Sequence, residues 1–151
     1  MIEYKDLEVV IREIKYDSEE YRNELKLRDE VLRKPLGMSL YDESLKADKN
    51  DIHIGAYVNN SMVGVLILTK LNSEDLKMRQ VAVKETLQLK KIGSKMVFYA
   101  EDLAKKSGYK NMILNARKTA VLFYEKHGYK KISTEFLEIN LPHYKMLKHI
   151  D

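Results

Sequence analysis

A change in hydrophobic period between residues 76 and 116 constrains the fold of this chain more than any other feature. Residues 76–83, LKMRQVAV, form a β-rich run, and residues 111–116, NMILNA, form a short apolar run typical of a buried strand. Between them, over residues 91–107, the apolar residues follow a helical stripe: Ile92, Met96, Val97, Ala100, Leu103 and Ala104. Two strands joined through a helix lie parallel in one sheet, so the pattern predicts a βαβ unit.

An antiparallel meander is predicted ahead of this unit. Residues 52–58 and 62–71 are apolar runs separated by Asn59-Asn60-Ser61, which predicts a hairpin because asparagine tolerates positive φ. Residues 8–15 are rich in β-branched residues and predict a first strand.

A helix is predicted over residues 18–33, between the first strand and the meander. Ser18 is placed to cap it, and Pro35 and Gly37 follow its end.

The end of the chain predicts one more helix and a closing strand pair. Residues 118–127 precede Gly128, which fits a helix terminus, and residues 129–138 and 143–148 have strand character. The predicted order is β-α-β-β-β-α-β-α-β-β. We therefore expect a mixed α/β sheet, an antiparallel meander leading into a central βαβ unit with flanking helices, in a single domain over residues 1–151.

The composition excludes several classes of protein. With no cysteine, the chain has no thiol nucleophile, thiolate metal site or disulfide framework. Its N-terminus lacks the pattern of a signal peptide, and no apolar run approaches the ~20 residues that span a membrane. These features predict a cytoplasmic protein without a membrane partner.

The net charge of +4 is a mild excess, and the densest basic stretches are only pairs: Lys90-Lys91, Lys105-Lys106 and Lys130-Lys131. A nucleic-acid binder usually gathers its basic residues on one face or in one run. We expect no nucleic-acid partner. Binding to nucleic acid or to an acidic partner is the third alternative, and a steep loss of affinity with salt would identify it.

The turn over residues 88–94, QLKKIGS, opens the helix of the βαβ unit. The first N–H groups of a helix have no intrahelical partner, and the helix dipole adds partial positive charge, so such a turn suits a pyrophosphate. Lys90 and Lys91 would favour a bound polyanion, although both side chains could equally point into water.

A second segment, residues 120–129 (AVLFYEKHGY), carries Tyr124 near the end of a predicted helix. A tyrosine there could donate its phenolic proton to a leaving group. By default, however, an aromatic side chain on a helix belongs to the core.

Together these segments resemble the GNAT superfamily of N-acetyltransferases. In that family a Gln/Arg-x-x-Gly-x-Gly/Ala turn between a strand and a helix binds the coenzyme A pyrophosphate, and here Gln88 and Gly93 match its ends. A later family helix reads roughly Ala-x-x-Phe-Tyr-x-x-x-Gly-Phe, which matches Ala120, Phe123, Tyr124, Gly128 and Tyr129. The element order agrees along the whole chain, and the sequence agrees closely over about 81–133.

The resemblance implies acetyl-CoA as the cosubstrate. The implied binding residues are Val81, Ala82 and Val83 in the strand, Gln88, Leu89, Lys90, Lys91, Ile92, Gly93 and Ser94 in the turn, and Asn115 and Tyr124 beyond it. Lys91 stands where the family has its first turn glycine, so the loop is expected either to be helical there or to contact phosphate less closely.

The resemblance also implies direct transfer of the acetyl group to a primary amine of a small molecule or peptide, without a covalent enzyme intermediate or a metal. A backbone N–H near Val81 would polarise the thioester carbonyl, and Tyr124 would protonate the departing thiolate. His53 and His143 are the candidate bases, because an unperturbed histidine titrates near neutrality. Arg33, in the first helix, could meet an acidic acceptor or lie in solvent.

Two further alternatives concern activity and assembly. A non-catalytic coenzyme A-binding module or sensor would keep the anion site and not use Tyr124, and Lys91 favours it. Members of the superfamily often form homodimers, so a homodimer is possible here.

Overall fold

The computed structural model describes residues 8–86 and 91–151. The backbone forms two compact units, and the chain passes through each of them twice. Unit 1 comprises the chain up to Thr69 together with Gln80–Ala100, and unit 2 comprises Lys70–Arg79 together with Glu101–Asp151. A single domain over residues 1–151 remains a prediction.

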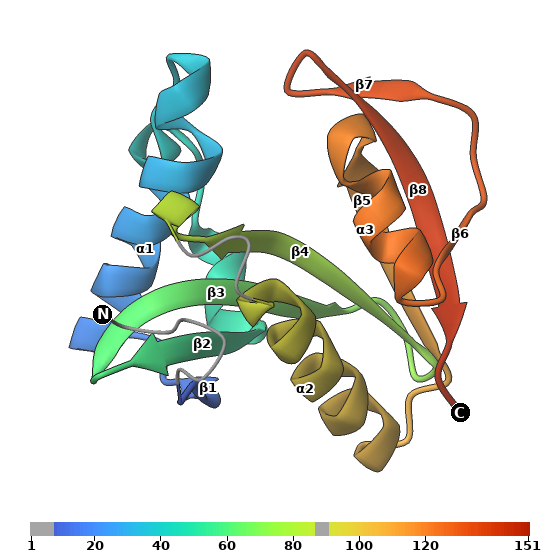
Figure 1. Cartoon of the computed structure of the whole chain (residues 1–151), viewed down its shortest axis with the longest axis horizontal. Helices are drawn as coiled ribbons and strands as arrows, with labels where there is room; N and C mark the ends of the chain where they lie inside the picture. The colour runs from blue at the N-terminus through green and yellow to red at the C-terminus, as the bar shows by residue number, and fades with distance from the viewer. Residues whose placement is uncertain (1–7, 87–90) are drawn as a thin grey trace. The chain divides into compact units, whose positions relative to one another are not determined.

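Unit 1 contains an antiparallel meander and the first helix. Strand β1 (Val10–Ile14) pairs antiparallel with β2 (Ile52–Val58), which pairs antiparallel with β3 (Ser61–Lys70) (Figure 1). Asn59 and Asn60 join β2 to β3 with φ values of 51° and 65°, as the hairpin prediction requires. The predicted strands and hairpin are therefore confirmed.

Helix α1 (Glu19–Leu32) begins where the sequence predicts. The Ser18 hydroxyl accepts a hydrogen bond from the backbone N–H of Tyr21 at 3.1 Å, which satisfies one of the unpaired donors of the first turn. Tyr21 and Leu27 pack with Ile14 and Val65 in the core of the unit. The segment between α1 and β2, which the sequence left without structure, forms the 3-10 helices η2 (Lys34–Leu36), η3 (Leu40–Asp42) and η4 (Lys46–Asn50).

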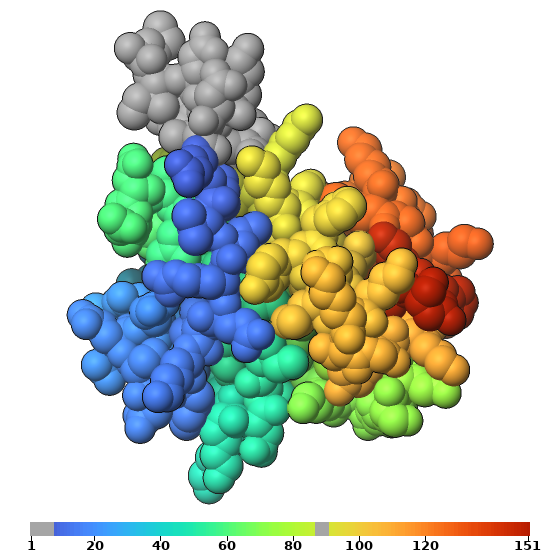
Figure 2. Space-filling model, turned by 90° about the horizontal axis from the view of Figure 1, so that it is seen from below, coloured from blue at the N-terminus to red at the C-terminus, as the bar shows by residue number. Residues whose placement is uncertain are grey.

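The predicted βαβ unit is confirmed. Strand β4 (Asp75–Val83) pairs parallel with β5 (Asn111–Arg117), from Asp75 opposite Asn111 to Met78 opposite Leu114. Helix α2 (Ile92–Lys106) connects them, and Gly108 follows its end at a φ of 89°. Figure 2 shows α2, coloured yellow to orange, at the molecular surface.

In unit 2, the strand β8 (Leu141–His149) pairs antiparallel with β5, with β6 (Lys130–Lys131) and with β7 (Phe136–Glu138). The predicted helix over 118–127 is wrong in part, because the 3-10 helix η6 (Lys118–Ala120) precedes a shorter α3 (Val121–Lys126). The predicted strand over 129–138 is also wrong in part, because β6 and β7 are separate strands.

Side-chain bonding explains why β6 and β7 are separate. The Ser133 hydroxyl accepts a hydrogen bond from the backbone N–H of Lys145 in β8 at 2.9 Å. This N–H therefore bonds a side chain and not the backbone carbonyl of a paired strand. Beyond β7 the chain turns through Ile139 and Asn140, whose φ values are 47° and 61°. An isoleucine at positive φ is unusual, and the sequence therefore did not predict this turn.

Across the described residues the chain forms eight strands with α-helices and 3-10 helices, antiparallel in unit 1 and mixed in unit 2. This is the predicted mixed α/β class.

Candidate active site

Strand β4 departs from regular geometry directly before its predicted cofactor-binding residues. Gln80 has a φ of 54°, in the left-handed region, within a strand. A left-handed residue within a strand is typical of a β-bulge. Val81, Ala82 and Val83 follow, with Ala82 and Val83 buried. The side chain of Gln80 accepts a hydrogen bond from Arg28 Nε at 3.3 Å, within unit 1.

Of the predicted phosphate turn, Gln88, Leu89 and Lys90 lie outside the described residues. Lys91 has a φ of 61°, and its carbonyl accepts the first helical hydrogen bond, from Lys95 N at 3.0 Å. Of the two alternatives expected at Lys91, the helical conformation is excluded, because this residue adopts the left-handed conformation that glycine adopts without steric cost. A less close contact with phosphate stays a prediction. Ile92 is buried, while Gly93 and Ser94 are partly exposed in the first turn of α2.

Tyr124 lies in α3 among aromatic side chains of unit 2. Its ring centroid is 5.0 Å from that of Phe123 and 5.7 Å from that of Tyr129, both in edge arrangements. Burial raises the pKa of the Tyr124 phenol well above its ordinary value of about 10. The phenol therefore stays protonated at neutral pH, so it can act as a proton donor but not as a base.

His143 lies on β8, almost completely buried, beside the β7–β8 turn. Its Nδ1 atom is 2.8 Å from the carbonyl oxygen of Leu141, so Nδ1 carries the proton and donates it. Its Nε2 atom is 3.4 Å from Oε2 of Glu138, and Oε1 of that carboxylate accepts from Asn115 Nδ2 at 3.2 Å. Unit 2 thus brings His143 and Asn115 to one carboxylate, which the sequence analysis did not identify.

His53 lies in unit 1 with both ring nitrogens in hydrogen bonds. Nδ1 is 2.8 Å from Glu24 Oε2, and Nε2 is 2.7 Å from the carbonyl oxygen of Asp48. Burial alone would lower the pKa of this imidazole, but the hydrogen bond and charge of Glu24, aided by Asp48, outweigh burial and raise the pKa. Its ring nitrogens are therefore engaged within the protein.

Arg33 is also engaged, since its guanidinium forms a two-pronged ion pair with Glu43. The Nε–Oε2 distance is 2.5 Å and the Nη2–Oε1 distance is 3.2 Å. Arg33 is buried and further donates to the carbonyl of Leu32 at 3.0 Å. Glu43 thus occupies the guanidinium N–H donors that an acidic acceptor would need.

Unit 1 contains a buried charged cluster formed by Glu24, Arg28, Asp48 and His53, of which only His53 was predicted as a site residue. Arg28 Nη1 donates to Glu24 Oε2 at 3.0 Å and to Asp48 Oδ2 at 2.9 Å. A signal for part of it exists, because Tyr21, Glu24 and Arg28 have the i, i+3, i+7 spacing of one helical face. Asp48 and His53 come from elsewhere in the chain, and no periodicity links them to that face.

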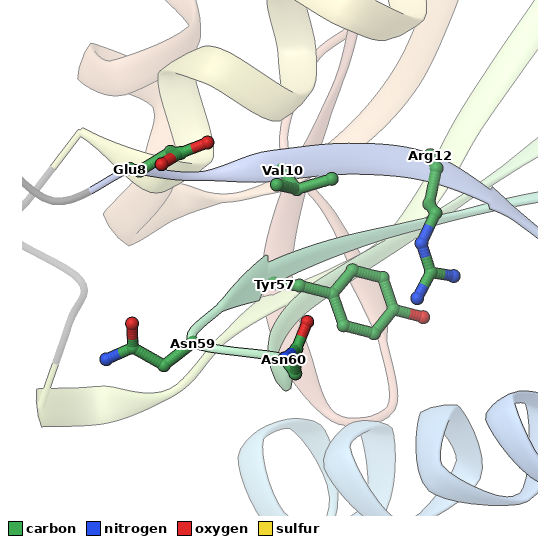
Figure 3. Close-up of a pocket in the computed structure, with 6 residues that line it drawn as sticks. All are labelled: Glu8, Val10, Arg12, Tyr57, Asn59 and Asn60. Atoms are coloured by element: carbon green, nitrogen blue, oxygen red, sulfur yellow. The ribbon is translucent and has the colours of Figure 1, made fainter.

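A hollow on unit 1 is lined by residues of β1, β2 and their neighbouring segments: Glu8, Val10, Arg12, Tyr57, Asn59 and Asn60 (Figure 3). The Arg12 guanidinium lies 4.0 Å from the centroid of the Tyr57 ring and pairs with Glu20. No residue predicted for the active site lines this hollow.

Residues 8–86 and 91–151 contain neither a candidate membrane-spanning helix nor a candidate metal site. No helix there combines the length and apolar character needed to cross a membrane, and no three His, Asp or Glu side chains gather as metal ligands would.

Comparisons with known proteins identify the family. The model of the acetyltransferase (GNAT) domain matches residues 16–150. The chain therefore belongs to the GNAT acetyltransferase family. It is 28% identical over 133 residues to the uncharacterized N-acetyltransferase YjcF of Bacillus subtilis, a match that covers 87% of this chain and 94% of that protein.

Solved structures share the fold at lower identity. A putative N-acetyltransferase from Lactobacillus plantarum superposes with a TM-score of 0.83 at 20% identity, covering 94% of this chain and 98% of that one. An aminoglycoside 6'-N-acetyltransferase in complex with coenzyme A superposes with a TM-score of 0.76 at 16% identity, covering 94% and 97%.

Proposed function

We propose that this chain is an acetyl-CoA-dependent N-acetyltransferase that moves an acetyl group directly to a primary amine. The family membership supports acetyl transfer. The observation that carries the proposal is the left-handed Gln80, which lies in β4 immediately before Val81–Val83. A left-handed residue within a strand turns neighbouring backbone groups away from the regular ladder, so that they can bond a ligand.

Acetyl-CoA would supply the acetyl thioester. Its pantetheine arm would bond the backbone of Val81–Val83, and its pyrophosphate would lie at the start of α2. The small residues Gly93 and Ser94 fit this role, because they leave the first-turn N–H groups accessible. The backbone N–H of Val81 would polarise the thioester carbonyl.

Tyr124 would donate a proton toward the departing thiolate. The phenol carries the proton that this role needs throughout the neutral range. As the amine adds, the thioester C–S bond breaks, and the sulfur leaves with the electron pair of that bond and takes up a proton.

His143 would accept the proton that the attacking amine must lose. Since Nδ1 faces the carbonyl of Leu141, Nε2, which lies 3.4 Å from Oε2 of Glu138, is the nitrogen proposed for this transfer. We propose structural roles instead for His53 and Arg33, because Glu24 and Glu43 already engage them. The acceptor is then a small molecule or a peptide that carries a primary amine.

The test combines binding with turnover. A ligand that binds only the folded state stabilises it by mass action, by about 2.7 kcal/mol at a hundredfold excess over its dissociation constant. We expect acetyl-CoA and free coenzyme A to raise the melting temperature, and ATP at the same concentration to leave it unchanged.

Turnover is measured as release of the coenzyme A thiol with a panel of primary amines. Because the chain has no cysteine, a thiol-reactive dye detects only the released coenzyme A. Binding without release for any amine would favour a non-catalytic coenzyme A-binding module. That alternative has one specific observation behind it, namely the lysine in place of the turn glycine at position 91.

A further inference from the structure

Gln80 occupies a conformation that its own chemistry disfavours. A side chain with a Cβ atom meets steric resistance in the left-handed region, and glutamine lacks the short polar side chain that helps asparagine there. Such conformations persist only where surrounding structure holds them. A contact with the surrounding structure must therefore restrain this residue.

Arg28 provides that restraint. It lies on α1, is only 2% exposed, and its Nε atom donates to Gln80 Oε1 at 3.3 Å. This bond joins a helix near the start of the chain to the irregular point of β4, 52 residues later.

The position of Arg28 is itself fixed by the buried charged cluster. Its Nη1 atom donates to both Glu24 and Asp48, and the Tyr21 hydroxyl donates to the same Asp48 oxygen at 2.6 Å. Buried charge-assisted hydrogen bonds of this kind are short and directional, so the guanidinium has little freedom to turn. In this position Nε donates to Oε1 of Gln80.

We propose that Arg28 is a positioning residue that holds Gln80 in its left-handed conformation and so orients the backbone N–H of Val81. The inference rests on the proposed function for the role of that N–H. The contact between Arg28 of α1 and Gln80 of β4 would then set the direction of the Val81 N–H toward the thioester carbonyl. Arg28 itself need not touch the substrate.

The experiment uses variants at Gln80, because removing Arg28 would take its positive charge away from two buried carboxylates, Glu24 and Asp48, and could prevent folding. Gln80→Ala deletes the acceptor and keeps the Cβ atom. We expect kcat for acetyl transfer to fall roughly tenfold to a hundredfold, with little change in acetyl-CoA affinity, as expected for a misaimed catalytic group. Gln80→Glu retains the acceptor and should keep most of the wild-type kcat.

A matched control is Ser18→Ala, which weakens the same helix at its cap but leaves the Arg28–Gln80 contact in place. Its kcat should equal that of the wild type at temperatures well below unfolding. The amide resonance of Val81, followed by NMR, gives a readout independent of catalysis. It should shift in Gln80→Ala and stay unchanged in Ser18→Ala.

An unchanged kcat in Gln80→Ala, or equal losses in Gln80→Ala and Ser18→Ala, would overturn the positioning role. A Val81 resonance that does not move in Gln80→Ala would also overturn it. If the wild type transfers acetyl to no amine, the proposed function fails, and the Val81 resonance still decides whether the Arg28 contact holds this conformation.

Discussion

The Nδ1 atom of His53 lies 2.8 Å from Oε2 of Glu24. The opposite ring nitrogen faces the carbonyl oxygen of Asp48, so hydrogen-bond acceptors flank the imidazole on both sides. Because a neutral imidazole has only one N–H, this geometry favours the protonated ring. With His53 protonated, the two positive charges of the buried cluster balance the two carboxylates.

A pH dependence of stability follows from this arrangement. The pKa of His53 is raised in the folded state, so protonated His53 stabilises the fold. This contribution to the free energy of unfolding is complete below the ordinary pKa of about 6.5 and is lost as pH rises through the folded-state pKa. We expect His53→Gln, which keeps a side-chain N–H but cannot titrate, to be destabilised by about 3 kcal/mol near pH 6. Thermal unfolding from about pH 6 to pH 9 should show the wild type approaching the variant.

Asp48 and Tyr21, which lie beside His53, do not change their charge over this pH range. Asp48 has a lowered pKa, because its bonds to Tyr21 and Arg28 outweigh the effect of burial, so it stays ionised above pH 6. The Tyr21 phenol has a raised pKa, through burial and then Asp48, and stays protonated. A constant difference between wild type and variant over the whole range would contradict the prediction.

Tyr124→Phe tests the proton donor. We expect kcat to fall by about a hundredfold, since a positioned acid or base typically contributes 10²–10⁴-fold. The acetyl-CoA thermal shift should be preserved. Tyr129→Phe is the matched control, because it also deletes a buried hydroxyl, one that donates to Glu101 at 2.7 Å. That variant should lose stability but retain kcat, and equal kcat losses in both variants would argue against the acid role.

Lys91→Gly tests the left-handed residue at the start of α2. Glycine removes the steric cost of positive φ, so we expect a stability gain of about 1 kcal/mol. Lys91→Ala removes the same charge but keeps the Cβ atom, and should bring no such gain. Lys95→Gly, in the first turn of the same helix, should lose about 1 kcal/mol. Thermal unfolding of the three variants distinguishes conformation from charge.

The acetyl-CoA affinity of the same Lys91→Gly variant tests the role of Lys91 in cofactor binding. If the lysine side chain holds the phosphate turn back from close contact, acetyl-CoA should bind the variant more tightly than the wild type. If the charge of Lys91 is what binds the phosphates, affinity should fall equally in Lys91→Gly and Lys91→Ala. Titrations at two salt concentrations separate these outcomes.

Two glycines of unit 1 should respond differently to alanine. A Cβ atom at Gly55 would lie 2.8 Å from Ile14 Cδ1 and 3.1 Å from a Tyr57 ring carbon. A Cβ atom at Gly64 would lie 2.9 Å from the sulfur of Met96. Methionine adapts more readily than a β-branched or aromatic side chain. We expect Gly55→Ala to cost about 2 kcal/mol and Gly64→Ala less, as measured by denaturant unfolding.

Much of the fold could be predicted because its elements carry local signals. The stripe from Ile92 to Ala104, the Asn59-Asn60 turn and the Ser18 cap each specify structure within a few residues. The predicted boundaries failed where a distant group intervenes. Ser133 bonds the backbone of Lys145, 12 residues away, and this bond separates β6 from β7.

The site residues divide in the same way. The chemical types that the proposed reaction needs, a tyrosine in α3 and a histidine after Pro142, could be selected from motifs. Their environments could not. His53 and His143 look alike as candidate bases in the sequence. In the structure, His53 lies between Glu24 and the carbonyl of Asp48 in unit 1, and His143 lies between the carbonyl of Leu141 and Glu138 in unit 2.

By itself, the sequence determined the class of fold, the order of the main elements and the family, because hydrophobic period, caps, turns and short motifs are local properties of the chain. Only the tertiary structure decided which charged side chains are buried together and which residues adopt left-handed conformations. Arg28, Gln80 and Asp48 are far apart in the chain, and their hydrogen bonds exist only once folding brings α1, β4 and η4 together. Burial then strengthens those bonds and shifts the pKa values, and neither effect can be seen in residue spacing.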